Sequence, residues 1–168
     1  NYSLVMLDAS KESLEENIKR VKEVVEYAHP RGVFVEGEIG MIKGRTEEGV
    51  YTEDDFLVRV EDAVELVEKS GVDILAVGIG TAHGFYQGKP EINFKRLAEV
   101  NEALSLPLVM HGGTGIPEED VRHAIRNGIN KVNVGTIIKY TYLSTVKEIL
   151  DREGPTIYTT ELMKPAQA

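Results

Sequence analysis

Short runs of apolar residues alternate along the chain with longer stretches in which apolar residues recur every three or four positions. The short runs are typical of strands that are buried on both faces, and the longer stretches predict helices with one apolar face. The predicted strands are Leu4–Leu7, Val33–Val35, Ile74–Val77, Leu108–Met110 and Val132–Val134. A helix is predicted after each strand, at Leu14–Ala28, Phe56–Val67, Phe94–Leu104, between Pro117 and Gly128, and at Ile137–Leu150.

The ends of several helices carry their own signals. Ser13 with Glu16 three residues later has the form of a capping box, and Thr52–Asp55 resembles a second helix start. Gly71 is placed to end the helix that follows. These signals support the division of the chain into strand–helix units.

Five strand–helix units in strict alternation predict an α/β fold with a parallel sheet and right-handed crossovers. Either a doubly wound open sheet or a TIM (β/α)8 barrel has this pattern. Reactive side chains follow nearly every predicted strand: Asp8, Glu36, Glu38, His83, His111 and Asn133. A barrel spreads its chemistry over the carboxyl ends of many strands, whereas an open sheet gathers it near one switch point, so the barrel is favoured.

Five units are too few to close an eight-stranded barrel. Residues 1–168 are therefore predicted to form a single partial (β/α)8 domain that lacks three N-terminal βα units and the C-terminal helices. The first residue is Asn1, and both ends are interpreted as cut edges.

Composition narrows the function classes. The net charge of −9 argues against nucleic acid or an anionic membrane as the main partner, because both need a positive surface. No cysteine is present, which excludes disulfides, thiolate catalysis and cysteine zinc sites, so any metal must use histidine and carboxylate. The apolar runs are far shorter than the roughly 20 residues of a membrane span. A cytoplasmic protein is the expectation.

Two histidines stand just after neighbouring predicted strands, and each is followed by glycine: His83-Gly84 and His111-Gly112. A single histidine in a loop is more often a hydrogen-bonded structural residue. Neighbouring strands lie about 4.8 Å apart, so both imidazoles could reach one metal ion. Zinc accepts imidazole nitrogens at about 2.0–2.1 Å. The other two, His29 and His123, lie on or near helices and are predicted to be surface residues.

Glycine-rich loops suggest a phosphate site beside the histidines. Gly112–Gly115 offers backbone N–H groups and the Thr114 hydroxyl, and it leads into a helix whose N-terminus favours an anion. Asn133–Thr136 again opens into a helix after the next strand. Barrels often bind phosphate with the loops of their last two strands. Lys89 is either a further phosphate contact or an exposed turn lysine.

The stretch Gly40–Val50 is long for a loop between a strand and a helix. It is punctuated by glycine and carries the paired carboxylates Glu47 and Glu48. It is either a lid that delivers a base or a solvated charged loop.

Together these motifs resemble the class II, metal-dependent fructose-bisphosphate and tagatose-bisphosphate aldolase family. The resemblance runs through nearly the whole chain and covers strands four to eight of the family's barrel. It is carried by Leu4–Ser10, Val35–Gly40, the two histidine–glycine motifs and Asn133–Thr136.

The resemblance implies a role for each matching residue. His83 and His111 are two of three zinc ligands, Glu38 lies at an alternative inner metal position, and Asp8 supports that position. Glu47 is the lid acid that moves a proton, with Glu48 as the alternative assignment. Asn133 contacts the substrate hydroxyl and the developing enediolate. The phosphate of dihydroxyacetone phosphate is held by Gly84, Gly112, Gly113, Thr114 and Thr136. A second divalent or a monovalent cation can accompany zinc.

The implied activity is that of a lyase of glycolysis and carbohydrate metabolism. Zinc acts as a Lewis acid while a ketose 1,6-bisphosphate is cleaved to, or formed from, dihydroxyacetone phosphate and glyceraldehyde 3-phosphate. Fructose and tagatose bisphosphates are not distinguished. The family's Asp-His pair, with its third zinc histidine, has no match here, so residues 1–168 alone are expected to be inactive. The resemblance implies a homodimer or homotetramer.

Two alternatives remain at this point. One is a non-catalytic relative, either a sugar-phosphate-binding barrel or the partner subunit of another aldolase chain. The other is a phosphate-binding fragment that needs no metal.

Overall fold

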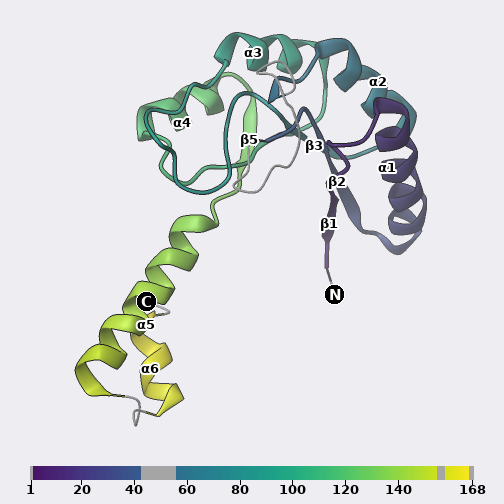
Figure 1. Ribbon diagram of the computed structural model, residues 1–168. Helices are drawn as coiled ribbons and strands as arrows, with labels where there is room; N and C mark the ends of the chain where they lie inside the picture. The colour runs from purple at the N-terminus through teal and green to yellow at the C-terminus, as the bar shows by residue number, and fades with distance from the viewer. Residues whose placement is uncertain (1, 43–55, 155–157, 167–168) are drawn as a thin grey trace.

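A computed structural model describes residues 2–42, 56–154 and 158–166. Five strands lie in this part of the chain: β1 (Leu4–Leu7), β2 (Phe34–Ile39), β3 (Ile74–Val77), β4 (Leu108–Met110) and β5 (Ile129–Val132). The helices are α1 (Leu14–Ala28), η1 (His29–Arg31), α2 (Val60–Ser70), α3 (Phe94–Ala103), α4 (Glu118–Arg126), α5 (Thr136–Glu153) and α6 (Thr159–Ala166). The predicted α/β alternation is confirmed (Figure 1).

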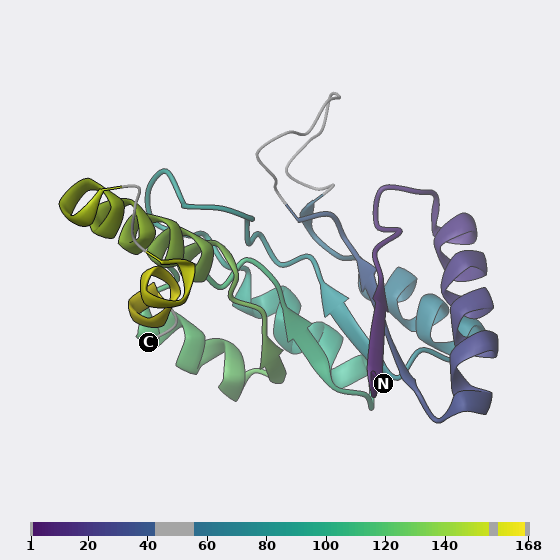
Figure 2. The same cartoon turned by 90° about the horizontal axis from the view of Figure 1, so that it is seen from below.

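The five strands form one parallel sheet in which each strand pairs with the next along the chain. Sequential order without a reversal is the arrangement of a barrel wall, whereas a doubly wound sheet changes direction at a switch point. Figure 2 shows the strands side by side, with the loops that follow β1 and β3 at the same edge of the sheet.

Helices α1 to α4 lie in an arc around one face of the sheet (Figure 1). Alternate side chains of a strand point to opposite faces, so only half of each strand packs against these helices. The core between the two layers is fully buried and apolar, and it includes Val21, Val35, Leu66, Leu75, Val77, Leu97, Leu108 and Met110. This packing makes the arc of helices the outer layer.

The opposite face of the sheet carries charged side chains. The register places Met6 beside Glu36 and Glu38 beside Ala76. It also places Ala76 beside Val109 and Val109 beside Lys131. Residues paired in this way share one face. Glu36, Glu38 and Lys131 therefore point away from α1–α4, toward the side that is the interior of a barrel.

Two strand boundaries differ from the prediction because charged residues lie inside strands. Glu36 and Glu38 were expected to follow a strand, but they lie within β2 and are buried. The last strand is Ile129–Val132 rather than Val132–Val134, since Lys131 and Asn130 interrupt its apolar pattern. In β2 the polar face of the strand is enclosed, whereas in β5 Asn130 is exposed and Lys131 is only partly buried.

Helix boundaries follow the predicted caps closely. The Ser13 hydroxyl accepts a hydrogen bond from the Glu16 N–H at 3.3 Å, and Gly71 ends α2 with φ +73°. Helix α2 begins at Val60, not at Phe56. The expected cap at Thr52–Asp55 lies outside the described residues.

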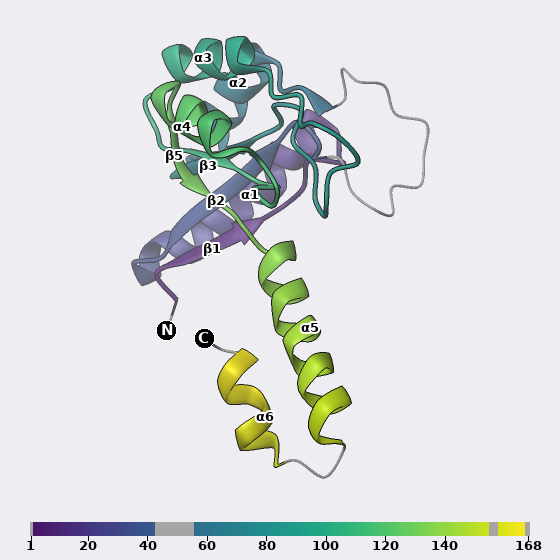
Figure 3. The same ribbon diagram turned by 90° about the vertical axis from the view of Figure 1, so that its left-hand side faces the viewer.

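Helices α5 and α6 extend away from the sheet and lie against each other (Figures 1 and 3). Ile149 is buried, whereas Ile138 and Leu143 on α5 are more than half exposed. Within the described residues, no helix combines the length and apolar character that a membrane span needs.

Candidate metal and phosphate site

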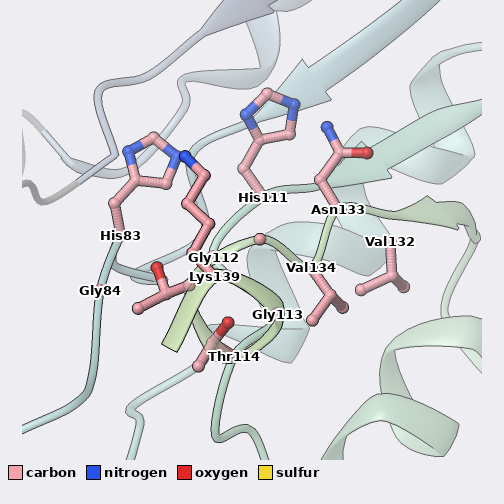
Figure 4. Close-up of a pocket in the computed structure, with 12 residues that line it drawn as sticks. His83, Gly84, His111, Gly112, Gly113, Thr114, Val132, Asn133, Val134 and Lys139 are labelled. Carbon is pink, nitrogen blue, oxygen red and sulfur yellow. The ribbon is translucent and has the colours of Figure 1, made fainter. Parts of the chain in front are cut away.

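His83 and His111 lie together at the carboxyl ends of β3 and β4 (Figure 4). Their ring centroids are 6.0 Å apart and the rings are inclined by 37°. With zinc–nitrogen distances of about 2.0–2.1 Å, two rings on one ion have centroids roughly 5–6 Å apart. His111 is buried, whereas His83 is exposed in its loop. The pair is thus spaced for a shared ion that remains open to solvent on one side.

The two histidine loops are packed backbone against backbone. Gly112 has φ +71°, and a Cβ added there would lie 2.4 Å from the carbonyl oxygen of Ala82. The Tyr86 hydroxyl accepts a hydrogen bond from the Ala82 N–H and donates one to the Gly112 carbonyl, each 3.0 Å long. Burial raises the pKa of Tyr86, so its hydroxyl remains a donor. These contacts fix the loop before His83 against the loop after His111.

Three charged side chains surround His111 on the inner face of the sheet. Its Nε2 lies 3.1 Å from Oε1 of Glu36, whose Oε2 is 2.5 Å from Nζ of Lys131. Its Nδ1 lies 3.1 Å from Oε2 of Glu38. That last contact has the distance of an ion pair without hydrogen-bond geometry, and Oε2 of Glu38 has no hydrogen-bond partner among the described residues.

The pKa values follow from this arrangement. Burial alone lowers the pKa of His111, but Glu36 and Glu38 outweigh it and raise the value to about 9. Burial raises the pKa of Glu36, but His111 and Lys131 more than offset that effect and leave it below its ordinary value. The two carboxylates thus favour the protonated form of the His111 imidazole, and His111 and Lys131 favour the ionised form of Glu36.

The residues present fit a divalent metal of the zinc type. Two imidazoles at the observed spacing and the unpartnered, buried Oε2 of Glu38 are zinc donors by type. The described residues hold no preformed group of three such side chains. Asp8 lies farther out, where it accepts hydrogen bonds from the Ser10 N–H at 3.0 Å and the Ser10 hydroxyl at 2.7 Å. Ser10 Oγ is 3.4 Å from Oε1 of Glu38, so Asp8 reaches Glu38 only through Ser10.

A cavity of about 530 Å³ opens beside the histidines (Figure 4). It is lined by His83, Gly84, His111, Gly112, Gly113, Thr114, Val132, Asn133, Val134, Gly135, Thr136 and Lys139. Every residue that was expected to bind phosphate lies in this lining except Lys89, which is exposed in the loop between β3 and α3.

Lys139 is the cation in the lining, and the sequence analysis did not single it out. It lies three residues after Thr136 on α5, so the two share a helix face. The sequence did contain a signal for Lys139, because this lysine lies one turn into a helix that follows a glycine-rich loop. Helix periodicity alone places such a side chain beside the helix N-terminus.

The two glycine-containing loops of the cavity, 112–115 and 133–136, are connected by hydrogen bonds. The Gly113 N–H donates to the Asn133 carbonyl at 3.0 Å, and the Ile137 N–H donates to the Thr114 hydroxyl oxygen at 3.2 Å. The Thr114 hydroxyl thus joins the glycine loop to the first turn of α5 and still has its own proton to donate. Glu47 and Glu48, the candidate lid acids, lie outside the described residues.

Comparisons with known proteins agree on one family. A family model described as fructose-bisphosphate aldolase class-II matches residues 1–168. A fructose-bisphosphate aldolase of Staphylococcus epidermidis is 40% identical over 166 residues, which is 99% of this chain and 58% of that protein. The chain thus spans rather more than half the length of the curated relatives it matches.

Solved structures give the same answer. The YdjI aldolase from Escherichia coli K12 matches 98% of this chain and 55% of its own, with 36% identity and a TM-score of 0.80. A putative fructose-1,6-bisphosphate aldolase from Coccidioides immitis matches 97% and 57%, with 30% identity and a TM-score of 0.81. These neighbours are TIM barrels, so the five strands correspond to part of a barrel wall.

The backbone contact between the histidine loops predicts a large effect of Gly112→Ala. Gly32 has a similar φ of +68° but open space around it, so Gly32→Ala is a matched control. The control is expected to lose about 1–2 kcal/mol of unfolding free energy through the left-handed backbone alone. Gly112→Ala is expected to lose more, because its Cβ meets the Ala82 carbonyl. Urea unfolding of both variants of the full-length protein measures the difference, and equal losses would contradict the packing described.

The Tyr86 hydroxyl predicts a second effect on stability. Tyr86→Phe leaves the Ala82 N–H and the Gly112 carbonyl without their partner, so the unfolding free energy is expected to fall by about 1–3 kcal/mol. Tyr27→Phe is the control, since Tyr27 is largely exposed and uses its ring to contact Arg31. Urea unfolding gives both values, and an unchanged Tyr86→Phe protein would show that the hydroxyl does not join the loops.

Proposed function

The chain belongs to the class-II fructose-bisphosphate aldolase family, and on that premise we propose that the full-length protein is a metal-dependent aldolase that cleaves and forms a ketose 1,6-bisphosphate. Its relatives are named as aldolases, which are lyases. The observation that carries the proposal is the His83–His111 pair at the mouth of a cavity built from two glycine loops. The substrates are fructose or tagatose bisphosphate, as the resemblance implies.

The metal of this proposal is zinc. His83 and His111 would hold it, with Glu38 as a carboxylate donor on the inner side. When bound, the metal supplies Lewis-acid polarisation of a substrate carbonyl. The contribution of Asp8 is indirect, through Ser10 and Glu38.

The phosphate end of the substrate determines where the reacting carbon lies. Backbone N–H groups of the two glycine loops, the Thr114 hydroxyl and the Lys139 ammonium supply donors and positive charge for a phosphate in the cavity. Gly84 and Thr136 line the same space. Holding the phosphate there orients the adjoining carbonyl toward the histidines, which replaces a bimolecular encounter by a fixed geometry.

Proton transfer completes the reaction. Asn133 lies in the lining and contacts the substrate hydroxyl in this proposal. A carboxylate of the 40–50 segment, Glu47 or Glu48, takes the proton from the carbon beside the ketone. The electron pair left on that carbon attacks the carbonyl carbon of glyceraldehyde 3-phosphate, and the aldehyde oxygen takes up a proton to become a hydroxyl. The resemblance assigns this proton to the aspartate of the Asp-His pair, which has no match in residues 1–168. Cleavage is the reverse. A role in glycolysis, a cytoplasmic location and a homodimer or homotetramer stay predictions.

Metal content and activity test the proposal together. In the full-length protein, His83→Ala is expected to lose most of its bound zinc and at least 100-fold in cleavage rate, since removing one ligand breaks the site. His29→Ala is the control, because His29 is an exposed histidine that pairs with Asp73. Zinc is measured by elemental analysis and cleavage by a coupled assay, with and without chelator.

Each contrary result has a defined meaning. Full metal content and full activity in His83→Ala would refute the metal assignment. A wild-type protein that binds sugar phosphate without metal or cleavage would instead support the non-catalytic alternative. Chelator-resistant cleavage would contradict the dependence on metal.

Lys139, which lines the cavity, and Lys89, which lies outside its lining, give a second test. Lys139→Met is expected to raise KM for the bisphosphate roughly ten- to hundredfold, the value of one hydrogen bond to a charged group. Lys89→Met is expected to change KM less than threefold, because Lys89 lies outside the described lining. Steady-state kinetics on both variants decide between the two lysines. A larger increase of KM in Lys89→Met than in Lys139→Met would place the phosphate site at the 87–90 turn.

A further inference from the structure

We propose that a second cavity, between α1 and the start of α2, binds an oxygen-preferring divalent cation, Mg²⁺ or Ca²⁺. This cavity has a volume of about 200 Å³. The polar residues in its lining are Ser10, Glu12, Asn17, Arg59 and Asp62. None of the described residues lines both this cavity and the one beside the histidines, so the proposal does not depend on the proposed function.

The observation that points to a ligand is the side chain of Asn17, near the start of α1. Asn17 is 2% exposed, and its Nδ2 donates to the carbonyl oxygen of Glu38 at 2.9 Å. That bond identifies the remaining amide atom as the oxygen. Oδ1 has no hydrogen-bond partner among the described residues. Buried amide oxygens are normally paired, so the cavity presents an acceptor that a bound ligand would satisfy.

Two carboxylates line the same cavity, Glu12 just before α1 and Asp62 in the first turn of α2. Acidic residues at helix N-termini also interact favourably with the helix dipole. Each has a basic neighbour as well: Arg20 Nη1 lies 3.2 Å from Oε1 of Glu12. Arg59 Nε lies 3.9 Å from Oδ2 of Asp62, and its side chain is 73% exposed. These interactions account for the carboxylates but leave the acceptor of Asn17 without a partner.

The donor set determines the class of cation. It consists of the two carboxylates, the amide oxygen of Asn17 and the hydroxyl oxygen of Ser10. The Ser10 hydroxyl donates its proton to Asp8 at 2.7 Å, which leaves lone pairs on its oxygen. Among the described residues of this lining none is a histidine, so the donors match magnesium and calcium rather than zinc.

The size of the cavity agrees with a hydrated ion. One water molecule takes about 30 Å³ in the liquid, so a cavity of about 200 Å³ would be poorly filled by a single bridging water. Magnesium keeps several of its waters when one or two carboxylates hold it, and calcium completes a larger shell with waters. A bound ion would connect the loop after β1, helix α1 and the start of α2.

Calorimetric titration of the full-length protein tests the proposal. The protein is first saturated with zinc, so that the histidines do not contribute, and MgCl₂ and CaCl₂ are then added in separate titrations. One saturable event is expected for at least one of the two ions, with a dissociation constant of about 1 mM or lower. Absence of saturable binding of both ions up to about 10 mM would overturn the proposal.

A charge substitution on α2 locates the binding event. Asp62→Asn is expected to raise the dissociation constant at least tenfold, because the affinity of such sites depends on the number of charged ligands. Glu61→Gln is the control, since Glu61 lies in the same helical turn and outside the described lining. The control is expected to stay within threefold of wild type. Equal losses in both variants would show that the ion binds elsewhere.

Arg59→Gln separates ion binding from a general structural defect. Its guanidinium lines the cavity and competes with a cation for Asp62, so its removal is expected to strengthen binding about threefold or more. A substitution that merely damaged the fold would weaken binding. Unchanged or weaker affinity in Arg59→Gln would therefore overturn the assignment of the ion to this cavity.

Discussion

The parallel register of the sheet is the constraint on which the candidate site depends. It places Glu36, Glu38 and Lys131 on the face opposite the helices, and it continues beyond the strand ends to His111. A shift of one residue in any strand would turn these side chains into the apolar core. The apolar half of each strand therefore fixes the polar half: packing of Val35, Leu75 and Leu108 against the helices orients the chemistry on the other side.

Buried charge on that face has a cost, and the structure offsets it by mutual pairing. Glu36 accepts from His111 and Lys131, so neither of its oxygens lacks a donor. Glu38 is the exception, because Oε2 has only a poorly oriented contact with His111. An unpaired buried carboxylate oxygen is unfavourable on its own. A bound cation would remove this unfavourable term. The position of Oε2 of Glu38 beside two imidazoles therefore supports the proposed metal site.

Much of the fold and of the site could be predicted from the sequence because the signals are local. Apolar periodicity located α1 and β3 to the residue, and glycine after histidine marked both site loops. Charged residues inside strands interrupted the same pattern in β2 and β5. Only tertiary contacts make Glu36 compatible with burial, and its partner Lys131 is partly exposed. Lys139 was missed although a local signal was present, since it lies one turn into a helix that follows a glycine-containing loop.

The proposed metal and phosphate subsites are not independent of each other, because Gly112 belongs to both. It follows His111, lines the cavity, contacts the Ala82 carbonyl region and accepts from Tyr86. Gly113 continues the connection by donating to the Asn133 carbonyl. The distance between the histidines and the phosphate donors is thus set by backbone contacts, which vary far less than long side chains do. A phosphate group bound in this cavity, as proposed, would therefore lie at a distance from the histidines that is fixed by the backbone.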